Sequence, residues 1–285
     1  MSFPPESYLI GAQKAGTTTL AYLLDQHPRL TIGQTKEPHF FTDFYDKGLD
    51  WYRRQYPDAA SALCMDASTS YAMAPLTDGW KQRDPRVYEG IPARVHAVRP
   101  DAKFIYLLRD PVDRTYSGYW HDVRMGVKKE GFTDAVRRNP FYLDVSDYYG
   151  QVQRWLQYFP LASFHFVLFE RMKDRPHEVV NECLAFLGLP GADSITLDSA
   201  QNQSYQVGWL GRQVNKIEIA LPGLRAVLRS ALPGGLKTLV QRVKAGSGRL
   251  PAMTEEDRRF LAEYFRERNQ NLERLTGLSL EGWRR

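Results

Sequence analysis

The sequence predicts an α/β fold of the P-loop-like kind, with a mainly parallel central sheet flanked by helices on both faces. Short apolar runs near 7–10, 62–66, 103–108 and 164–169 are typical of buried strands. Helical patterns separate these runs, and that alternation favours parallel strands joined by crossover helices. The first run also leads through a glycine-containing turn into a helix, which is the layout of a phosphate-binding loop.

The first strand, around Tyr8 to Ile10, is followed by a turn that runs from Gly11 to Gly16. Glycine lets a backbone approach an anion, and the first N–H groups of the following helix point at it. In a nucleoside-triphosphate loop, lysine directly follows the second glycine, but Thr17 stands there and the lysine, Lys14, comes earlier. The turn therefore predicts a phosphate site without an obligatory metal. The alternative is an ordinary glycine turn between strand and helix.

Residues 43–60 and 74–100 are rich in Asp, Pro, Arg and Tyr and show little periodicity. We therefore expect irregular segments or short helices over 43–100. Connections of this kind often shape a substrate pocket. Their aromatic side chains could stack on a sugar or aryl acceptor, or simply pack into a small core.

A second motif follows the apolar run of Phe104 to Leu108, which is typical of a strand buried on both faces. Arg109 ends this strand, and Asp110-Pro111 is a good helix start. Arg109 and Ser117, two turns into the helix, are placed to converge on one anion. The alternative is that Arg109 pairs with a neighbouring aspartate. Further along the helix lie His121 and Arg124. They would either help to hold the anion bound by Arg109 and Ser117 or form a solvated face.

These two motifs, about a hundred residues apart, resemble those of the sulfotransferase family, especially its heparan-sulfate and bacterial types. Further similar segments are Lys36 to Phe41 (KEPHFF), Met65 to Tyr71 and Phe164 to Glu170. The resemblance covers roughly 7–205 and 250–282. It implies a donor, 3′-phosphoadenosine 5′-phosphosulfate, used without a metal. The donor's 5′ end would be held by Lys14, Ala15, Gly16, Thr17, Thr18 and Thr19, and its 3′-phosphate by Arg109 and Ser117.

The resemblance also implies catalytic roles. Lys14 would stabilise the departing 5′-phosphate, and Glu37 would take the proton from an acceptor hydroxyl, with His39 as the alternative base. Asp66 would orient the acceptor or Lys14. The acceptor is expected to be a carbohydrate, a lipid or a metabolite. Many glycosaminoglycan enzymes have lysine where this chain has Ala67, so their acceptor preference is not carried over.

Residues 200–250 are expected to form a mobile and basic helical insertion. In sulfotransferases a loop in this region closes over the donor, which implies donor contacts for Tyr205 and Arg212. Residues 219–250 contain six Lys or Arg and no acidic residue. Such a stretch either lies on an anionic membrane surface or packs on the domain with solvated basic faces.

The composition is that of one globular domain over 1–285, with 43% hydrophobic residues and a net charge of +5. The excess charge suits a polyanionic donor, and no nucleic-acid-binding motif accompanies it. Cys64 and Cys183 both lie in apolar surroundings and are expected to be buried thiols. Without a signal-peptide pattern, a cytoplasmic location is expected. The remaining rivals are a P-loop small-molecule kinase and a catalytically silent nucleotide-binding protein.

Overall fold

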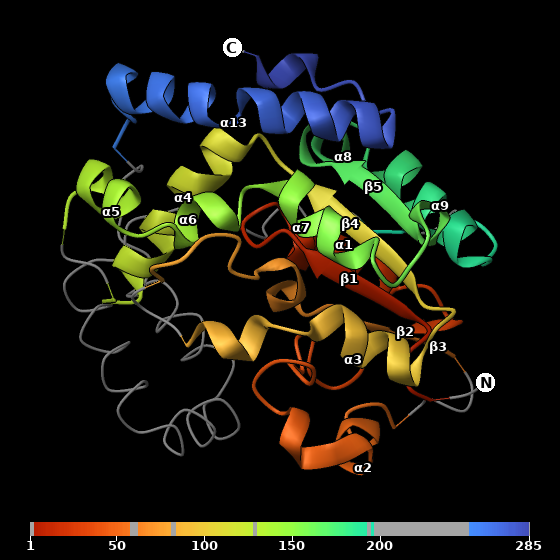
Figure 1. Ribbon diagram of the computed structural model, residues 1–285. Coiled ribbons are helices and arrows are strands. Elements are labelled where there is room, and N and C mark those ends of the chain that lie inside the picture. Colours follow the sequence, from red (N-terminus) through yellow and green to blue (C-terminus); the bar gives the residue numbers. More distant parts are fainter. Residues whose placement is uncertain are drawn as a thin grey trace, which may run out of the picture.

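The computed structural model describes residues 3–57, 62–80, 84–127, 130–192, 195–196 and 251–284. Five parallel strands form one sheet in the order β2-β3-β1-β4-β5 (Figure 1). The central strand β1 pairs with β3 on one side and β4 on the other, so the carboxyl ends of these three strands meet at one edge. The strands are β1 (Ser7–Gly11), β2 (Leu30–Thr31), β3 (Leu63–Asp66), β4 (Lys103–Leu108) and β5 (Phe164–Leu168).

The predicted parallel α/β fold is confirmed, and the four apolar runs correspond to β1, β3, β4 and β5. Strand β2 was not anticipated. It has only two residues, Leu30 and Thr31, which pair with Leu63 and Cys64 of β3. A strand of this length has no side-chain period that a sequence pattern can reveal.

Helices surround the sheet, and α13 runs along one side of the molecule across α4 and α7 (Figure 1). The longer helices are α1 (Thr17–Leu24), α3 (Ile91–Val98), α4 (Pro111–Arg124), α7 (Tyr148–Trp155), α9 (Pro176–Leu187) and α13 (Glu255–Thr276). The shorter ones are α2 (Gly48–Arg53), α5 (Phe132–Arg138), α6 (Phe141–Asp144) and α8 (Phe169–Asp174). Short 3-10 turns are η1 (Tyr45–Lys47), η2 (Thr69–Ala72), η3 (Pro85–Tyr88), η4 (Leu161–Ser163) and η5 (Glu281–Trp283).

The described residues of the segment 43–100 form short helices and turns on either side of β3, in keeping with the weak periodicity of the segment. Most of its aromatic side chains pack into a small core. Tyr52 stacks on Phe40 with ring centroids 4.2 Å apart, and Trp51 lies 5.1 Å from Phe44. Tyr45 is the exception in this group, since 40% of it is exposed.

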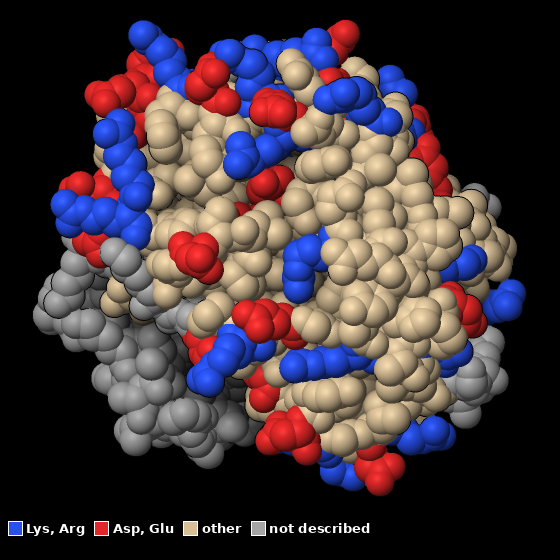
Figure 2. Space-filling view, viewed as in Figure 1, with Lys and Arg blue, Asp and Glu red and all other residues tan. Residues whose placement is uncertain are grey.

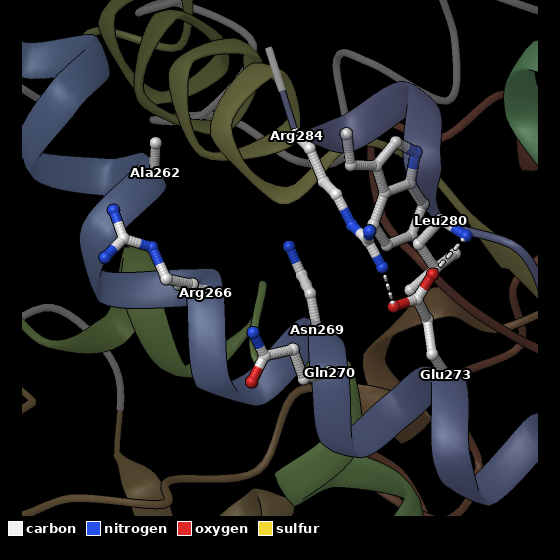
Figure 3. Close-up of a pocket in the computed structure, with 8 residues that line it drawn as sticks. Ala262, Arg266, Asn269, Gln270, Glu273, Leu280 and Arg284 are labelled. Carbon is white, nitrogen blue, oxygen red and sulfur yellow. Dashed lines mark hydrogen bonds and ion pairs between the residues drawn. The ribbon is translucent and has the colours of Figure 1, made fainter.

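Helix α13 is fixed at both ends by the features that its sequence suggests. The Thr254 hydroxyl accepts the Asp257 N–H at its start, and Gly277, with φ 71°, ends it. The chain then turns back to form a pocket of about 300 Å³ against the helix (Figure 3). There Glu273 accepts the Leu280 N–H at 2.7 Å and pairs with Arg284 at 2.6 Å.

Charged side chains of both signs alternate over α13, at the top of the view in Figure 2. Both cysteines are buried free thiols, as expected. Among the described residues, no helix has the length and apolar character needed to cross a bilayer. The predicted donor contacts Tyr205 and Arg212, and the basic stretch 219–250, lie outside the described residues.

Candidate active site

The loop after β1 has the backbone geometry that an anion site requires. The Ala12 N–H donates to the Leu107 carbonyl of β4 at 2.7 Å, which ties the loop to the neighbouring strand. Gly16 precedes α1 with φ 91°, and a side chain there would meet the ring of Phe169 at 3.0 Å. Lys14 also has positive φ, 72°, which is costly for a residue with a side chain and is typical of functional loops.

Two arginines of the second motif hold this loop by its carbonyl groups. Arg109 donates to the Lys14 carbonyl at 3.0 Å, and the fully buried Arg114 donates to the Gln13 carbonyl at 3.0 Å. These bonds engage carbonyl oxygens that would otherwise repel an anion. The two predicted motifs therefore form a single structure at the carboxyl ends of β1 and β4.

Cations gather around Lys14. Burial, and then repulsion from Arg124, Arg109 and Arg114, together lower the pKa of Lys14 to about 8. A cluster of positive charges that repel one another in a half-buried site is electrostatically suited to a polyanion.

Ser117 is the second residue predicted to hold the 3′-phosphate. It lies on α4 and is 4% exposed, and its hydroxyl has no hydrogen-bond partner among the described residues. A buried hydroxyl without a partner costs free energy, so a ligand oxygen at this place would satisfy it. The residues present therefore fit a phosphate group.

Arg109 does not bond to a neighbouring aspartate in the described part of the chain. Its guanidinium bonds to the Lys14 carbonyl and stacks on Phe169 at 5.1 Å, while Asp113 pairs with Arg258 at 3.4 Å. The Tyr148 hydroxyl donates to the Arg109 carbonyl at 2.8 Å and fixes the end of β4.

Glu37 lies at the other side of the phosphate loop, in the segment that follows β2. Its two carboxylate oxygens accept separate donors, Lys36 Nζ at 2.6 Å and the Thr69 hydroxyl at 3.0 Å. Burial acts to raise the pKa of Glu37, but the charge of Lys36 and the hydrogen bonds from Lys36 and Thr69 act together against it, and the pKa lies below its usual range. Glu37 is therefore ionised near neutral pH.

His39 is held beside Glu37 by the turn that follows β3. Its ring Nε2 lies 3.6 Å from a Glu37 oxygen, and its Nδ1 lies 2.8 Å from the Ser70 hydroxyl. Its backbone, with φ 52°, donates to the Ser68 hydroxyl at 3.0 Å. Both candidate bases are thus in one cluster.

Thr17 joins the two halves of the site. It is the first residue of α1 and is buried, and its hydroxyl accepts Lys36 Nζ at 3.4 Å. Thr18, the next residue, is exposed. Lys36 was not singled out from the sequence as a site residue, since a lysine in a polar turn is usually solvated.

Asp66 has a different environment from the one expected for it. It is fully buried and accepts the hydroxyl groups of Tyr52 at 2.6 Å and Tyr71 at 2.7 Å, as well as the Ser68 N–H at 2.9 Å. No contact joins it to Lys14 in the described part of the chain. Asp66 therefore organises the turn that carries Ser68 and Thr69, and it acts on the site indirectly.

Comparison with known proteins gives consistent matches. The sulfotransferase domain model matches residues 4–214. Heparan sulfate glucosamine 3-O-sulfotransferase 6 of Mus musculus is 31% identical over 195 residues, which cover 65% of this chain and 52% of the relative. The human 3-O-sulfotransferase 3B1 is 30% identical over 196 residues, covering 65% and 46%. The chain spans about half the length of these curated relatives.

Solved structures show the same fold. A sulfotransferase from Alicyclobacillus acidocaldarius has a TM-score of 0.69 and 24% identity, with both chains fully covered. Mouse sulfotransferase SULT7A1, complexed with PAP, has a TM-score of 0.50 and 15% identity over 99% of this chain and 90% of its own. Since the domain model spans both phosphate motifs and the Glu37 segment, this chain belongs to the sulfotransferase domain family.

Proposed function

We propose that this protein transfers a sulfuryl group from 3′-phosphoadenosine 5′-phosphosulfate to an acceptor hydroxyl. The observation that carries the proposal is that two candidate anion sites lie together at one sheet edge. One is the Lys14 loop, and the other is the unpartnered Ser117 hydroxyl on the helix that follows Arg109. Membership of the sulfotransferase domain family supports sulfuryl transfer. The mouse SULT7A1 structure contains PAP, which is adenosine 3′,5′-bisphosphate, and this supports the proposed type of donor.

In the proposed reaction, the acceptor oxygen attacks the sulfur atom in line with the leaving group. The bond between sulfur and the 5′-phosphate oxygen breaks, and adenosine 3′,5′-bisphosphate leaves. Glu37 accepts the proton that the acceptor hydroxyl loses. Lys14 and the N–H groups at the start of α1 stabilise the charge that develops on the departing phosphate. Positioning and charge stabilisation supply most of the rate in such transfers.

The acceptor is proposed to be a hydroxyl-bearing carbohydrate, lipid or metabolite. The named relatives are heparan sulfate enzymes, which supports a carbohydrate. Glu37 is preferred to His39 as the base, because its carboxylate is ionised and borders the Thr17 end of the phosphate loop through Lys36. We also propose that residues 1–285 act as one catalytic domain.

The proposal is tested by calorimetric titration with adenosine 3′,5′-bisphosphate in the absence of metal, beside AMP and Mg²⁺-ATP. We expect the bisphosphate to bind more tightly than either, since only it fills both anion sites. In Ser117→Ala, the preference for the bisphosphate over AMP should shrink about tenfold, as for a lost hydrogen bond to a charged group. Ser163 directly precedes β5, at the amino end of that strand. Ser163→Ala is therefore the matched control and should keep the preference for the bisphosphate. Preference for Mg²⁺-ATP would instead indicate a kinase.

A further inference from the structure

Lys36 is placed where the phosphate loop meets the candidate base. Its ammonium group lies 2.6 Å from Glu37 Oε1 and 3.4 Å from the hydroxyl of Thr17, the first residue of α1. One side chain thus contacts the group proposed to deprotonate the acceptor and a residue proposed to hold the donor. In an in-line transfer, the moving group passes between those two positions.

The backbone of Lys36 is fixed, so this placement is not that of a solvated surface lysine. The Ala67 N–H donates to the Lys36 carbonyl at 3.2 Å, which attaches the segment to the end of β3. The side chain is 24% exposed, and its salt-bridge partner Glu37 is 29% exposed. Ala67 is fully buried and brings no charge. Among the described residues, the ammonium group in contact with Glu37 is therefore that of Lys36.

The present partner of Lys36 is also an obstacle to the chemistry. A carboxylate paired with an ammonium group at 2.6 Å holds its negative charge more firmly and accepts a proton less readily. Glu37 becomes a better base only if Lys36 leaves it and pairs with another anion. The sulfuryl oxygens of the donor are such an anion, and Thr17 shows that Lys36 already reaches the donor side of the site.

We propose that Lys36 is a second catalytic cation that exchanges its partner: it pairs with Glu37 in the donor-free protein and with the transferring sulfuryl group when the donor is bound. This inference rests on the proposed function. The lysine donates hydrogen bonds to the sulfuryl oxygens throughout and neither gains nor loses a proton. The acceptor proton goes to Glu37, and the 5′-phosphate leaves with the bonding electrons.

Binding measurements separate this role from a structural one, because the donor and its product differ only in the sulfuryl group. In Lys36→Met, the affinity for 3′-phosphoadenosine 5′-phosphosulfate should fall about tenfold or more, which is the loss of one charge-assisted hydrogen bond. The affinity for adenosine 3′,5′-bisphosphate should change less than about threefold, since this product lacks the sulfuryl group. Lys36→Arg should recover much of the donor affinity. Lys173→Met, at an exposed position on α8, is the matched control.

The exchange itself is tested by a double-mutant cycle with Glu37→Gln. If Glu37 competes with the donor for Lys36, its neutralisation should tighten donor binding about tenfold, an amount typical of a broken ion pair of this kind. That gain should disappear in the Lys36→Met background. A gain that persists there, or equal losses of donor and product affinity in Lys36→Met, would overturn the inference. Failure of the unmodified protein to bind the bisphosphate at all would instead remove the proposed function.

Discussion

At the scale of single residues, the site combines charges that differ strongly in environment. Lys14 is half-buried among arginines, whereas Glu37 is stabilised by an adjacent lysine. The pKa values of both residues are therefore lowered, which disfavours the charged form of Lys14 and favours the charged form of Glu37. Each can be followed by its dependence on pH.

Lys14 should make donor binding depend on pH in the alkaline range. Its pKa in the free protein is lowered to about 8, mainly by burial and then by Arg124, Arg109 and Arg114. A bound phosphate favours the charged lysine, so binding takes up a proton above pH 8 and affinity falls as pH rises, by at most about tenfold per unit. Calorimetry at pH 8.5 in two buffers of different ionisation enthalpy measures that proton. Lys14→Arg keeps its charge and should show no uptake from this position.

The stability of the free protein should respond with the opposite sign. The folded pKa of Lys14 lies below its unfolded value of 10.5, so the folded state binds fewer protons between about pH 8 and 10.5. The cost of burying the charged lysine is fully present below pH 8 and is relieved as pH rises through this window.

The binding prediction has its own contrary outcome. Wild-type affinity for the bisphosphate that stays constant from pH 7.5 to 9.5 would contradict the assignment of Lys14 to the phosphate.

Glu37 and His39 can be distinguished as bases by turnover with an acceptor found by labelled-donor screening. Glu37→Gln should lose about 10²- to 10⁴-fold in kcat, the usual contribution of a general base, while still binding the bisphosphate. Because the pKa of Glu37 in the donor-free protein lies below its usual range, the fall of wild-type kcat/KM caused by protonation of this group should have its midpoint below about pH 4.3, the ordinary glutamate value. Near-normal turnover by Glu37→Gln would transfer the role to His39.

At the scale of elements, α4 connects both proposed anion sites with α6 and α7. Its start is capped by Asp110, whose carboxylate accepts the Val112 N–H at 2.8 Å. One turn on, the buried Arg114 bonds to the Gln13 carbonyl of the loop and to the Ser146 hydroxyl at 3.1 Å, between α6 and α7. The guanidinium group of Arg114 thus ties the loop after β1 to the turn between α6 and α7.

Arg114→Lys is the change that tests this support. Lysine keeps the charge but cannot reproduce the planar fork that serves both acceptors, so at least one buried polar group loses its partner. We expect the free energy of unfolding to fall by about 1–3 kcal/mol, together with weaker bisphosphate binding as the loop loosens. Urea denaturation and calorimetry measure the two effects. Arg138→Lys, on the exposed side of α5, is the control, and equal behaviour of both variants would show that the guanidinium fork is dispensable.

The elements also show what a sequence pattern can and cannot reveal. Both motifs were predicted because each is contiguous, with an apolar run, a turn and a helix start that follow one another in the chain. The Lys36–Thr17 contact and the Arg114–Gln13 bond were not, because they join residues 19 and 101 positions apart. The buried environment of Asp66, the last residue of β3, was not predicted either, because it depends on Tyr52 from α2 as well as on Tyr71 from the turn that follows β3.

At the scale of the whole molecule, the end of the chain supports the site from outside. After α13, the turn held by Glu273 brings Trp283 against Tyr148 with ring centroids 6.0 Å apart, and Tyr148 holds the Arg109 carbonyl. The Trp283 N–H also approaches Glu170 at 3.5 Å. The C-terminal turn is therefore linked through one buried tyrosine to the end of β4, although it is far from the phosphate motifs in the chain.

Trp283→Ala should consequently affect both stability and ligand binding. Removing a buried tryptophan side chain is expected to lower the free energy of unfolding by about 3–5 kcal/mol. Loss of its contact with Tyr148 should weaken bisphosphate binding a few-fold, because the Arg109 end of β4 becomes less well fixed. Trp283→Phe keeps a ring against Tyr148 and should restore most of the affinity. Arg284→Ala removes only an exposed ion pair and should cost about 1 kcal/mol or less. A Trp283→Ala protein that is less stable but binds the bisphosphate normally would show that the C-terminal turn contributes to folding alone.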